Sequence, residues 1–217
     1  MTRATFRGHH TGELMGIPAT GRELAMESIS WFRCEGGRIA EEWTHFDRIG
    51  MMVQFGVAPP PPSGGPLPLG KADAPEHLQP TSDPATIVTR WFERIDRGGV
   101  PDLTQYLTSD WNTHDLPPFP GISDGITSAW QAFPYALKAF SDFRHDIEAH
   151  VVEGDKIATR LTARGKHTGE FLGVPATGKE LVMSGIGIRR IVDGKMAEHW
   201  AQIDAMSLLQ QLGAIPS

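Results

Sequence analysis

The sequence predicts an α+β fold, because patterns typical of helices come first and patterns typical of antiparallel strands follow them. Apolar residues recur at helical spacing in 85–96 and 125–140, and Pro134 interrupts or kinks the second stretch. After residue 141, strand-like segments are separated by tight turns at 153–155 and 193–194. Helices followed by an antiparallel meander are therefore expected.

The elements can be justified in order along the chain. The segment "ATIVTRWFERID" (85–96) follows "TSDP", a plausible helix cap, and 101–110 is expected to continue a helical hairpin. Two strands and their turn are expected within 142–169, and two more strands in "KELVMSGIGIRRIV" and "KMAEHWAQID". A short closing helix, "DAMSLLQQLG", is expected to end at Gly213 as its C-cap.

The end of the chain repeats its beginning. "HTGELMGIPATG" occupies 10–21, and "HTGEFLGVPATG" occupies 167–178. Thr2–Gly56 aligns without a gap with Thr159–Gly213, and 26 of the 55 aligned pairs are identical. The shared glycines and prolines favour the same local structure in both copies. The first copy holds the last three strands and the closing helix, and it lacks the helices that precede them in the second copy.

A proline-rich segment separates the two copies. Residues 57–84 contain nine of the 17 prolines, so an extended linker is expected there. The predicted organisation is a partial repeat over 1–56, the linker over 57–84 and a complete domain over 85–217. Two interpretations of 1–56 stay open: a tandem domain whose start has been cut, or a true remnant that packs on the sheet of the complete domain.

Composition excludes several classes of function. The chain has 217 residues, 40% hydrophobic and 21% charged, and its net charge is −6, so a nucleic-acid partner is not expected. Cys34 is the single cysteine, which excludes an intrachain disulfide and fits a reducing compartment. Neither a signal peptide nor a membrane span is expected. These observations predict a cytoplasmic protein.

Four motifs in order carry a family resemblance: "EGDKIATR", "HTGEFLGVPATG", "DGKMAEHW" and "QQLG". Together they resemble the SnoaL-like polyketide cyclases, or ester cyclases, over 85–217 and again over 1–56. The resemblance implies the nuclear transport factor 2-like fold, in which helices close a cone-shaped, curved antiparallel sheet over a pocket. It also implies cofactor-free ring closure of an apolar or aromatic ester by intramolecular aldol condensation, with one aspartate as general acid and base. Some members of the family hydroxylate instead.

By the match to the family's W-x-x-x-D pattern, the catalytic aspartate is Asp204. Asp204 follows Trp200 by four positions, so both are expected on one face of a strand, with Trp200 as a pocket wall. An apolar cavity would tune such a carboxylate for proton transfer near neutrality. The alternatives are that Asp204 caps the helix "AMSLLQQL" and that Trp200 is an ordinary core aromatic residue.

Three further residues are candidates for the pocket. His114, in the loop "DWNTHDLPPFPG", could hold a substrate carbonyl or share a proton with Asp204, and its alternative is a loop histidine that binds backbone carbonyls. Trp111 could stack on a flat substrate or fill the helix layer. His167 could donate a hydrogen bond in the pocket or have a structural role.

Other side chains are expected to be structural. His199 is expected on the surface or at an interface, and Glu198 is expected to pair with an arginine of the neighbouring strand. Asp142 and His145 are expected to cap a strand or to lie on the surface, with contact at the pocket rim as the alternative, and Cys34 is expected to be buried. No metal site and no nucleotide cofactor are expected, because the characteristic ligand spacings and glycine-rich motifs are absent from the sequence.

The first copy keeps Trp43 and Asp47 but has no counterpart of Trp111 or His114. It is therefore expected to be catalytically inactive and to mimic a dimer partner on the complete domain. A homo-oligomer through the sheet face is also open. Two alternatives to a cyclase remain: a small-ligand-binding or dimerisation module of the same fold, and a hydratase or hydrolase in the same cone.

Overall fold

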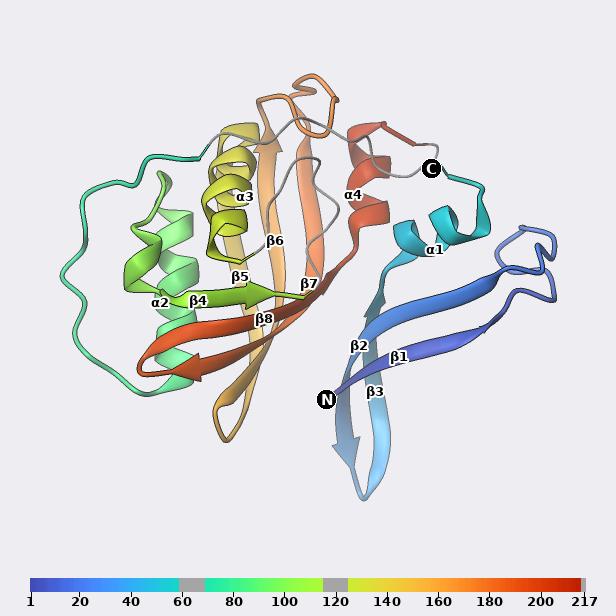
Figure 1. Cartoon of the computed structure of the whole chain (residues 1–217), viewed down its shortest axis with the longest axis horizontal. Coiled ribbons are helices and arrows are strands. Elements are labelled where there is room, and N and C mark those ends of the chain that lie inside the picture. The colour runs from blue at the N-terminus through green and yellow to red at the C-terminus, as the bar shows by residue number, and fades with distance from the viewer. Residues whose placement is uncertain (59–68, 115–124, 216–217) are drawn as a thin grey trace.

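The computed structural model describes residues 1–58, 69–114 and 125–215 (Figure 1). It contains a three-stranded sheet, order β1-β2-β3, and a five-stranded sheet, order β4-β8-β7-β6-β5. All neighbouring strands run antiparallel except β4, which pairs with β8 in parallel. The predicted α+β class is confirmed.

The N-terminal elements are β1 (Thr2–His9), β2 (Glu23–Glu35), β3 (Arg38–Phe46) and α1 (Arg48–Phe55). The complete domain contains the helices α2 (Pro84–Asp96), α3 (Ile126–Ala139) and α4 (Ala205–Leu212), and the short 3-10 helix η1 (Leu103–Gln105). Its strands are β4 (Leu107–Thr113), β5 (Phe140–Glu153), β6 (Lys156–His167), β7 (Glu180–Val192) and β8 (Lys195–Ile203). Pro134 lies inside α3, and Gly213 ends α4 in the left-handed conformation, as expected.

One predicted element is wrong. Residues 101–110 do not continue a helical hairpin; they form η1 and the start of β4. Asp102 caps η1, since its carboxylate accepts a hydrogen bond from the backbone N–H of Thr104 at 3.1 Å. The chain then pairs with β8 in a parallel register that begins at Leu107 and Met196. This pairing joins segments far apart in sequence, so local periodicity does not reveal it.

The inner face of the five-stranded sheet is covered by α2 and α3 (Figure 1). This core cluster includes Val88, Trp91 and Phe92 of α2, Ile157 of β6 and Ile191 of β7. The outer face is covered by the N-terminal sheet. Ile29 and Trp31 of that sheet pack against the sheet residues Ala158, Ile186 and Ile188. The five-stranded sheet is thus covered by apolar side chains on both faces.

The two copies meet through equivalent elements. β2, β3 and α1 correspond to β7, β8 and α4 with both bounds of each element offset by 157 positions. Contacts between the copies join β2 to β7, β3 to β8 and α1 to α4. This is the arrangement of a two-fold interface between identical subunits, formed here within one chain.

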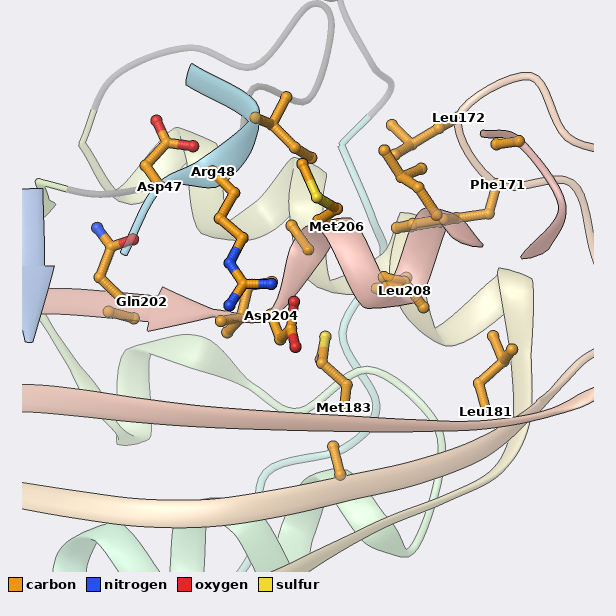
Figure 2. Close-up of a pocket in the computed structure, with 18 of the residues that line it drawn as sticks. Asp47, Arg48, Phe171, Leu172, Leu181, Met183, Gln202, Asp204, Met206 and Leu208 are labelled. Atoms are coloured by element: carbon orange, nitrogen blue, oxygen red, sulfur yellow. The ribbon is translucent and has the colours of Figure 1, made fainter. Parts of the chain in front are cut away.

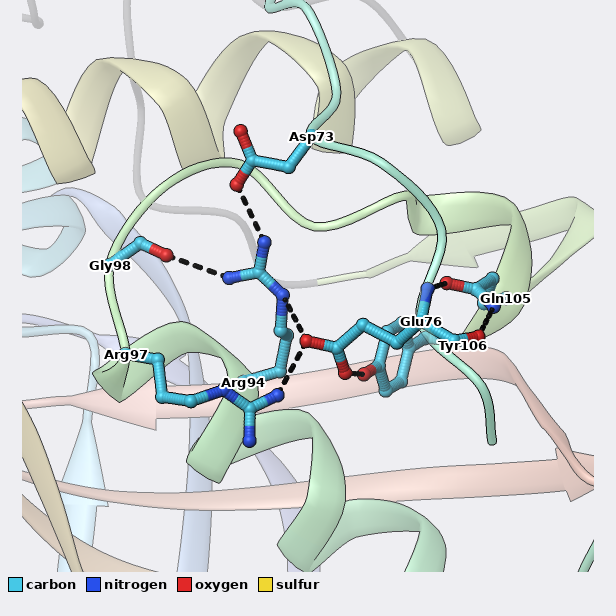
Figure 3. Close-up of polar contacts among 7 residues, drawn as sticks. All are labelled: Asp73, Glu76, Arg94, Arg97, Gly98, Gln105 and Tyr106. Atoms are coloured by element: carbon cyan, nitrogen blue, oxygen red, sulfur yellow. Dashed lines mark hydrogen bonds and ion pairs between the residues drawn. The ribbon is translucent and has the colours of Figure 1, made fainter. Parts of the chain in front are cut away.

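The described part of the linker is a strap bound to the complete domain (Figure 3). Residues 69–83 form neither helix nor strand. The guanidinium of Arg94 on α2 lies 2.6 Å from a carboxylate oxygen of Asp73 and 2.9 Å from one of Glu76. Arg97 also pairs with Glu76 at 2.6 Å, and the Gln105 amide bonds both backbone groups of Glu76. Two carboxylates and one amide therefore hold the strap in place.

Candidate active site

A cavity of about 660 Å³ lies between the inner sheet face, α3, α4 and the start of α1 (Figure 2). Its wall is mainly apolar, with contributions from Phe140 and Phe143 of β5, Leu181 and Met183 of β7, and Leu208 of α4. The polar residues on its wall are Glu27, Asp47, Arg48, His114, Arg164, Gln202 and Asp204. A cavity of this size and lining suits a small apolar ligand that carries a few polar groups.

Asp204 lies at this cavity directly after β8 and is partly buried. It is the N-cap of α4: its Oδ1 accepts a hydrogen bond from the backbone N–H of Ser207 at 3.1 Å. Aspartate suits this junction because its side chain satisfies one of the free amides at the helix start. No second hydrogen bond to this carboxylate occurs among the described residues, so Oδ2 is available to a ligand. The capping role, given above as the alternative for Asp204, is present in the structure.

The N-terminal copy contributes three charged residues to the same cavity, Glu27, Asp47 and Arg48. Asp47 caps α1 through a hydrogen bond from the Gly50 N–H at 2.8 Å and is exposed. Arg48 follows it, and Figure 2 shows its guanidinium directed toward Asp204. Arg48 is not among the residues predicted from the sequence. Its role as a lining residue depends on contact between the two copies, which no local pattern reveals.

His114 also lines the cavity, and its ring stacks on Trp200 with centroids 4.6 Å apart and planes 4° apart. Its Nε2 lies 3.1 Å from Glu198 Oε2. Glu198 in turn accepts a hydrogen bond from Arg190 at 2.7 Å, so the predicted arginine partner is confirmed. This hydrogen bond is the main reason that the pKa of Glu198 is lowered. The proline-rich loop after His114 lies outside the described residues.

The structure places Trp200 on the outer face rather than in the cavity wall. Trp200 pairs in register with Ile188, and both pack against the N-terminal sheet. The strand ends at Ile203, so Asp204 adopts a helix-cap conformation and does not share the face of Trp200. The expectation that both line one pocket face is therefore wrong.

Trp111 and His167 do not line the cavity either. Trp111 is buried in the core beneath α2 and α3, which matches its alternative role. His167 is fully buried; its Nδ1 accepts a hydrogen bond from the Thr177 N–H at 3.2 Å and lies 3.0 Å from the Thr177 hydroxyl. His10 and Thr20 make the same contacts in the first copy. In both copies the repeated segment therefore forms a loop whose two ends are joined by the contact between the histidine and the threonine.

Three further expectations are corrected. His199 faces inward and is enclosed, so the pKa of His199 is lowered well below its usual value, first by burial and then by the charges of Arg189 and His114. His145 is neither a cap nor a surface residue: its Nδ1 lies 2.6 Å from Asp96 of α2, and it packs against Phe143. Cys34 is exposed, at an irregularity where β2 pairs with β3.

Within the described ranges, no group of three or more histidine, cysteine or acidic side chains is arranged to hold a metal ion. None of the described helices is both long enough and apolar enough to span a membrane.

Comparison with known proteins identifies the family. The model of the SnoaL-like polyketide cyclase family matches residues 1–55 and 85–212. The chain belongs to this family. The two matched ranges contain both copies of the repeated segment.

Characterised relatives of this SnoaL-like chain are cyclases. Aklanonic acid methyl ester cyclase DnrD of Streptomyces peucetius is 30% identical over 129 residues, which are 58% of this chain and 88% of the relative. Nogalonic acid methyl ester cyclase of Streptomyces nogalater is 29% identical over 121 residues, 55% of this chain and 89% of the relative.

Solved structures agree with the family assignment. AclR from Streptomyces galilaeus superposes with a TM-score of 0.55 at 25% identity, over 61% of this chain and 82% of AclR. TsrD from Streptomyces laurentii gives a TM-score of 0.53 at 29% identity, over 62% of this chain and all of TsrD. These likenesses confirm the predicted nuclear transport factor 2-like fold.

Proposed function

We propose that the chain is a cyclase that closes a ring in a polyketide-type ester by an intramolecular aldol reaction, with Asp204 as the general base. The observation that carries this proposal is the position of Asp204. One oxygen of this carboxylate is held by the α4 backbone, and the other is available in a mainly apolar cavity. A carboxylate fixed in this way, close to apolar walls, suits proton abstraction from carbon.

The proposed reaction needs no cofactor because atoms and electrons balance within the substrate. Asp204 removes a proton from the carbon next to the ester carbonyl, which gives an enolate. The enolate carbon attacks a ketone carbon of the same molecule, so a carbon–carbon bond forms and the ketone oxygen becomes an alkoxide. The alkoxide then takes up a proton, which Asp204 can return. The product has the same mass as the substrate.

Arg48 and His114 are suited to assist this reaction. The Arg48 guanidinium is directed toward Asp204, so it can stabilise the negative charge that develops on the enolate or alkoxide oxygen (Figure 2). The His114 ring is fixed by stacking on Trp200 and by its contact with Glu198, which orients it at the cavity wall. In this proposal Trp200 is a positioning residue that acts through His114.

Turnover by matched aspartate variants tests the proposal. Aklanonic and nogalonic acid methyl esters are offered to the wild type, Asp204→Asn and Asp47→Asn, and conversion is followed as a chromatographic shift without a change in mass. Asparagine is also a good helix cap, so both variants keep their caps. Conversion that collapses by about 10²-fold or more only in Asp204→Asn supports the base. Equal rates in all three proteins would exclude Asp204 as the base.

A second candidate function follows from the cap itself. The hydrogen bond that Asp204 accepts from the Ser207 N–H caps α4, and this structural role alone accounts for an aspartate at this position. A binding module of the same fold would therefore need no catalytic aspartate. Ligand binding by the wild type without conversion of any ester, and equal affinity in Asp204→Asn, would favour this candidate over the cyclase. Release of methanol or a gain in mass would instead indicate a hydrolase or a hydratase.

A further inference from the structure

The inner face of the sheet holds a buried positive charge that has no acidic partner. Arg189 of β7 is only 6% exposed, and its side chain makes no hydrogen bond or ion pair within the part of the chain that the structure describes. Burial lowers the pKa of Arg189 to about 10, so its guanidinium stays charged near neutral pH. A buried charge without a counter-charge is costly, and proteins normally pair it.

The surroundings of Arg189 do not compensate this charge. Its guanidinium carbon lies 4.9 Å from the ring centroid of Phe92, a favourable cation–π contact that does not replace the counter-charge a buried ion normally has. His150 lies on the same side, and the charge of Arg189 contributes to the lowered pKa of His150, after burial. Asp96 is an acid near this region, but it is already bound to His145 at 2.6 Å.

A second unsatisfied polar atom points to the same place. His199 Nε2 is buried without a hydrogen-bond partner in the described structure, as is Arg189 Nη1. A Cβ atom built on Gly187 would lie 3.1 Å from Arg189 Nη1 and 3.3 Å from His199 Nε2. Both atoms therefore converge on one point above a residue that has no side chain. A neutral imidazole protonated on Nε2 donates there, as does the guanidinium.

This point lies one strand away from a residue of the cavity wall. Gly187 pairs in register with Ala201, and Ala201 lines the cavity. Phe143 connects the two regions as well, because it lines the cavity and its ring packs on His145 with centroids 4.9 Å apart. Arg189 and His199 do not themselves line the cavity, and their Nη1 and Nε2 atoms fill the space over Gly187, so the flexible Arg189 side chain has to turn toward Ala201 for an anion to reach both donors.

We infer that Arg189 and His199 form a binding site for an anionic oxygen next to the cavity wall at Ala201, so that the preferred ligand is a planar, largely apolar molecule with a carboxylate or similar anionic group. The anion would satisfy both donors and neutralise the buried guanidinium. This inference rests on the proposed function only in that both use the same cavity. It concerns binding and is independent of the identity of the catalytic base.

Calorimetric titration with two matched ligands tests the site. The probes are 2-naphthoate and its neutral analogue 2-naphthamide, at fixed ionic strength. The wild type is expected to bind the carboxylate about tenfold or more tightly than the amide. Arg189→Met is expected to lose this preference. Arg144→Met is the matched control, because Arg144 is two-thirds exposed on the outer side of β5, and it should keep the wild-type preference.

Two further variants keep the test decisive if Arg189→Met does not fold. Arg189→Lys and His199→Gln each retain a polar group and are expected to reduce the preference several-fold. A wild type that shows no preference for the carboxylate, or that binds neither probe, would overturn the inference, as would an unchanged preference in all three variants.

The outcome is separate from that of the turnover assay. A chain that selects the carboxylate but converts no ester keeps this site and loses the cyclase proposal. A chain that converts esters without any preference for an anion does the reverse.

Discussion

Alanine should destabilise the protein at Gly169 but hardly affect it at Gly12, although both glycines occupy the same place in the repeated segment. A Cβ built on Gly169 would lie 2.5 Å from the carbonyl oxygen of Lys138 and 3.1 Å from the Cα of Ala139. The backbone N–H of Gly169 donates to Ala139 at 2.9 Å, so this close approach is part of the hydrogen bonding at the end of α3. A Cβ built on Gly12 would have no atom within 4 Å among the described residues beyond its own chain neighbours, because the first copy has no counterpart of α3.

Neither glycine has a positive φ, so the difference between them is steric. Forcing a methyl group against backbone atoms typically costs about 1–3 kcal/mol. In a chain of this size, that cost lowers the melting temperature by about 2–4 °C per kcal/mol. Gly169→Ala should therefore melt several degrees below the wild type, and Gly12→Ala should stay within about 0.5 kcal/mol of it. Thermal unfolding followed by circular dichroism measures both, and equal melting temperatures would refute the reasoning.

Three further outcomes are expected. Arg94→Met should lower the free energy of unfolding in urea by about 2–4 kcal/mol, because Arg94 is buried between two carboxylates of the strap. Arg97→Met, at a side chain that is 58% exposed, should lower it by less than about 1 kcal/mol. Similar losses in both variants would show that burial does not matter. The wild type should lose stability as the pH falls below about 6.5, because the unfolded chain protonates His199 while the folded chain, with its lowered pKa, does not. His199→Gln should reduce that slope by up to about 1.4 kcal/mol per pH unit, and an unchanged slope would contradict the assignment. Residues 69–217 alone should be less stable or less soluble than the full chain, because removal of the N-terminal sheet exposes apolar side chains of β7. A soluble monomer of equal melting temperature would show that the N-terminal sheet does not stabilise the domain.

Much of the fold can be predicted because its signals are local. Apolar residues at helical spacing predict α2 and α3, and the glycine-containing turns predict where β5 to β8 begin and end. The cap at Asp204 and the pairing of Glu198 with a neighbouring arginine also follow from short-range rules.

The inner and outer faces of β8 could not be told apart from the sequence. Alternation divides a strand into two sets of side chains, but it identifies the buried set only when the other set is polar. Here helices cover one face and the N-terminal sheet covers the other, so both sets are largely enclosed. Trp200 was therefore expected inside and lies outside, and His199 was expected outside and lies inside. The contribution of Arg48 has a similar cause, since it depends on contact between distant segments.

A two-fold interface between identical subunits encodes both of its surfaces with the same residues, so every substitution occurs twice. The contact of β2, β3 and α1 with β7, β8 and α4 has the same geometry, but two different segments of one polypeptide encode its two surfaces. Arg48 corresponds to Ala205, and Trp31 corresponds to Ile188. At this pair of positions only the N-terminal half carries a guanidinium, an asymmetry that no dimer of identical subunits could maintain. Each half can change charge or size at this boundary without imposing the same change on the other.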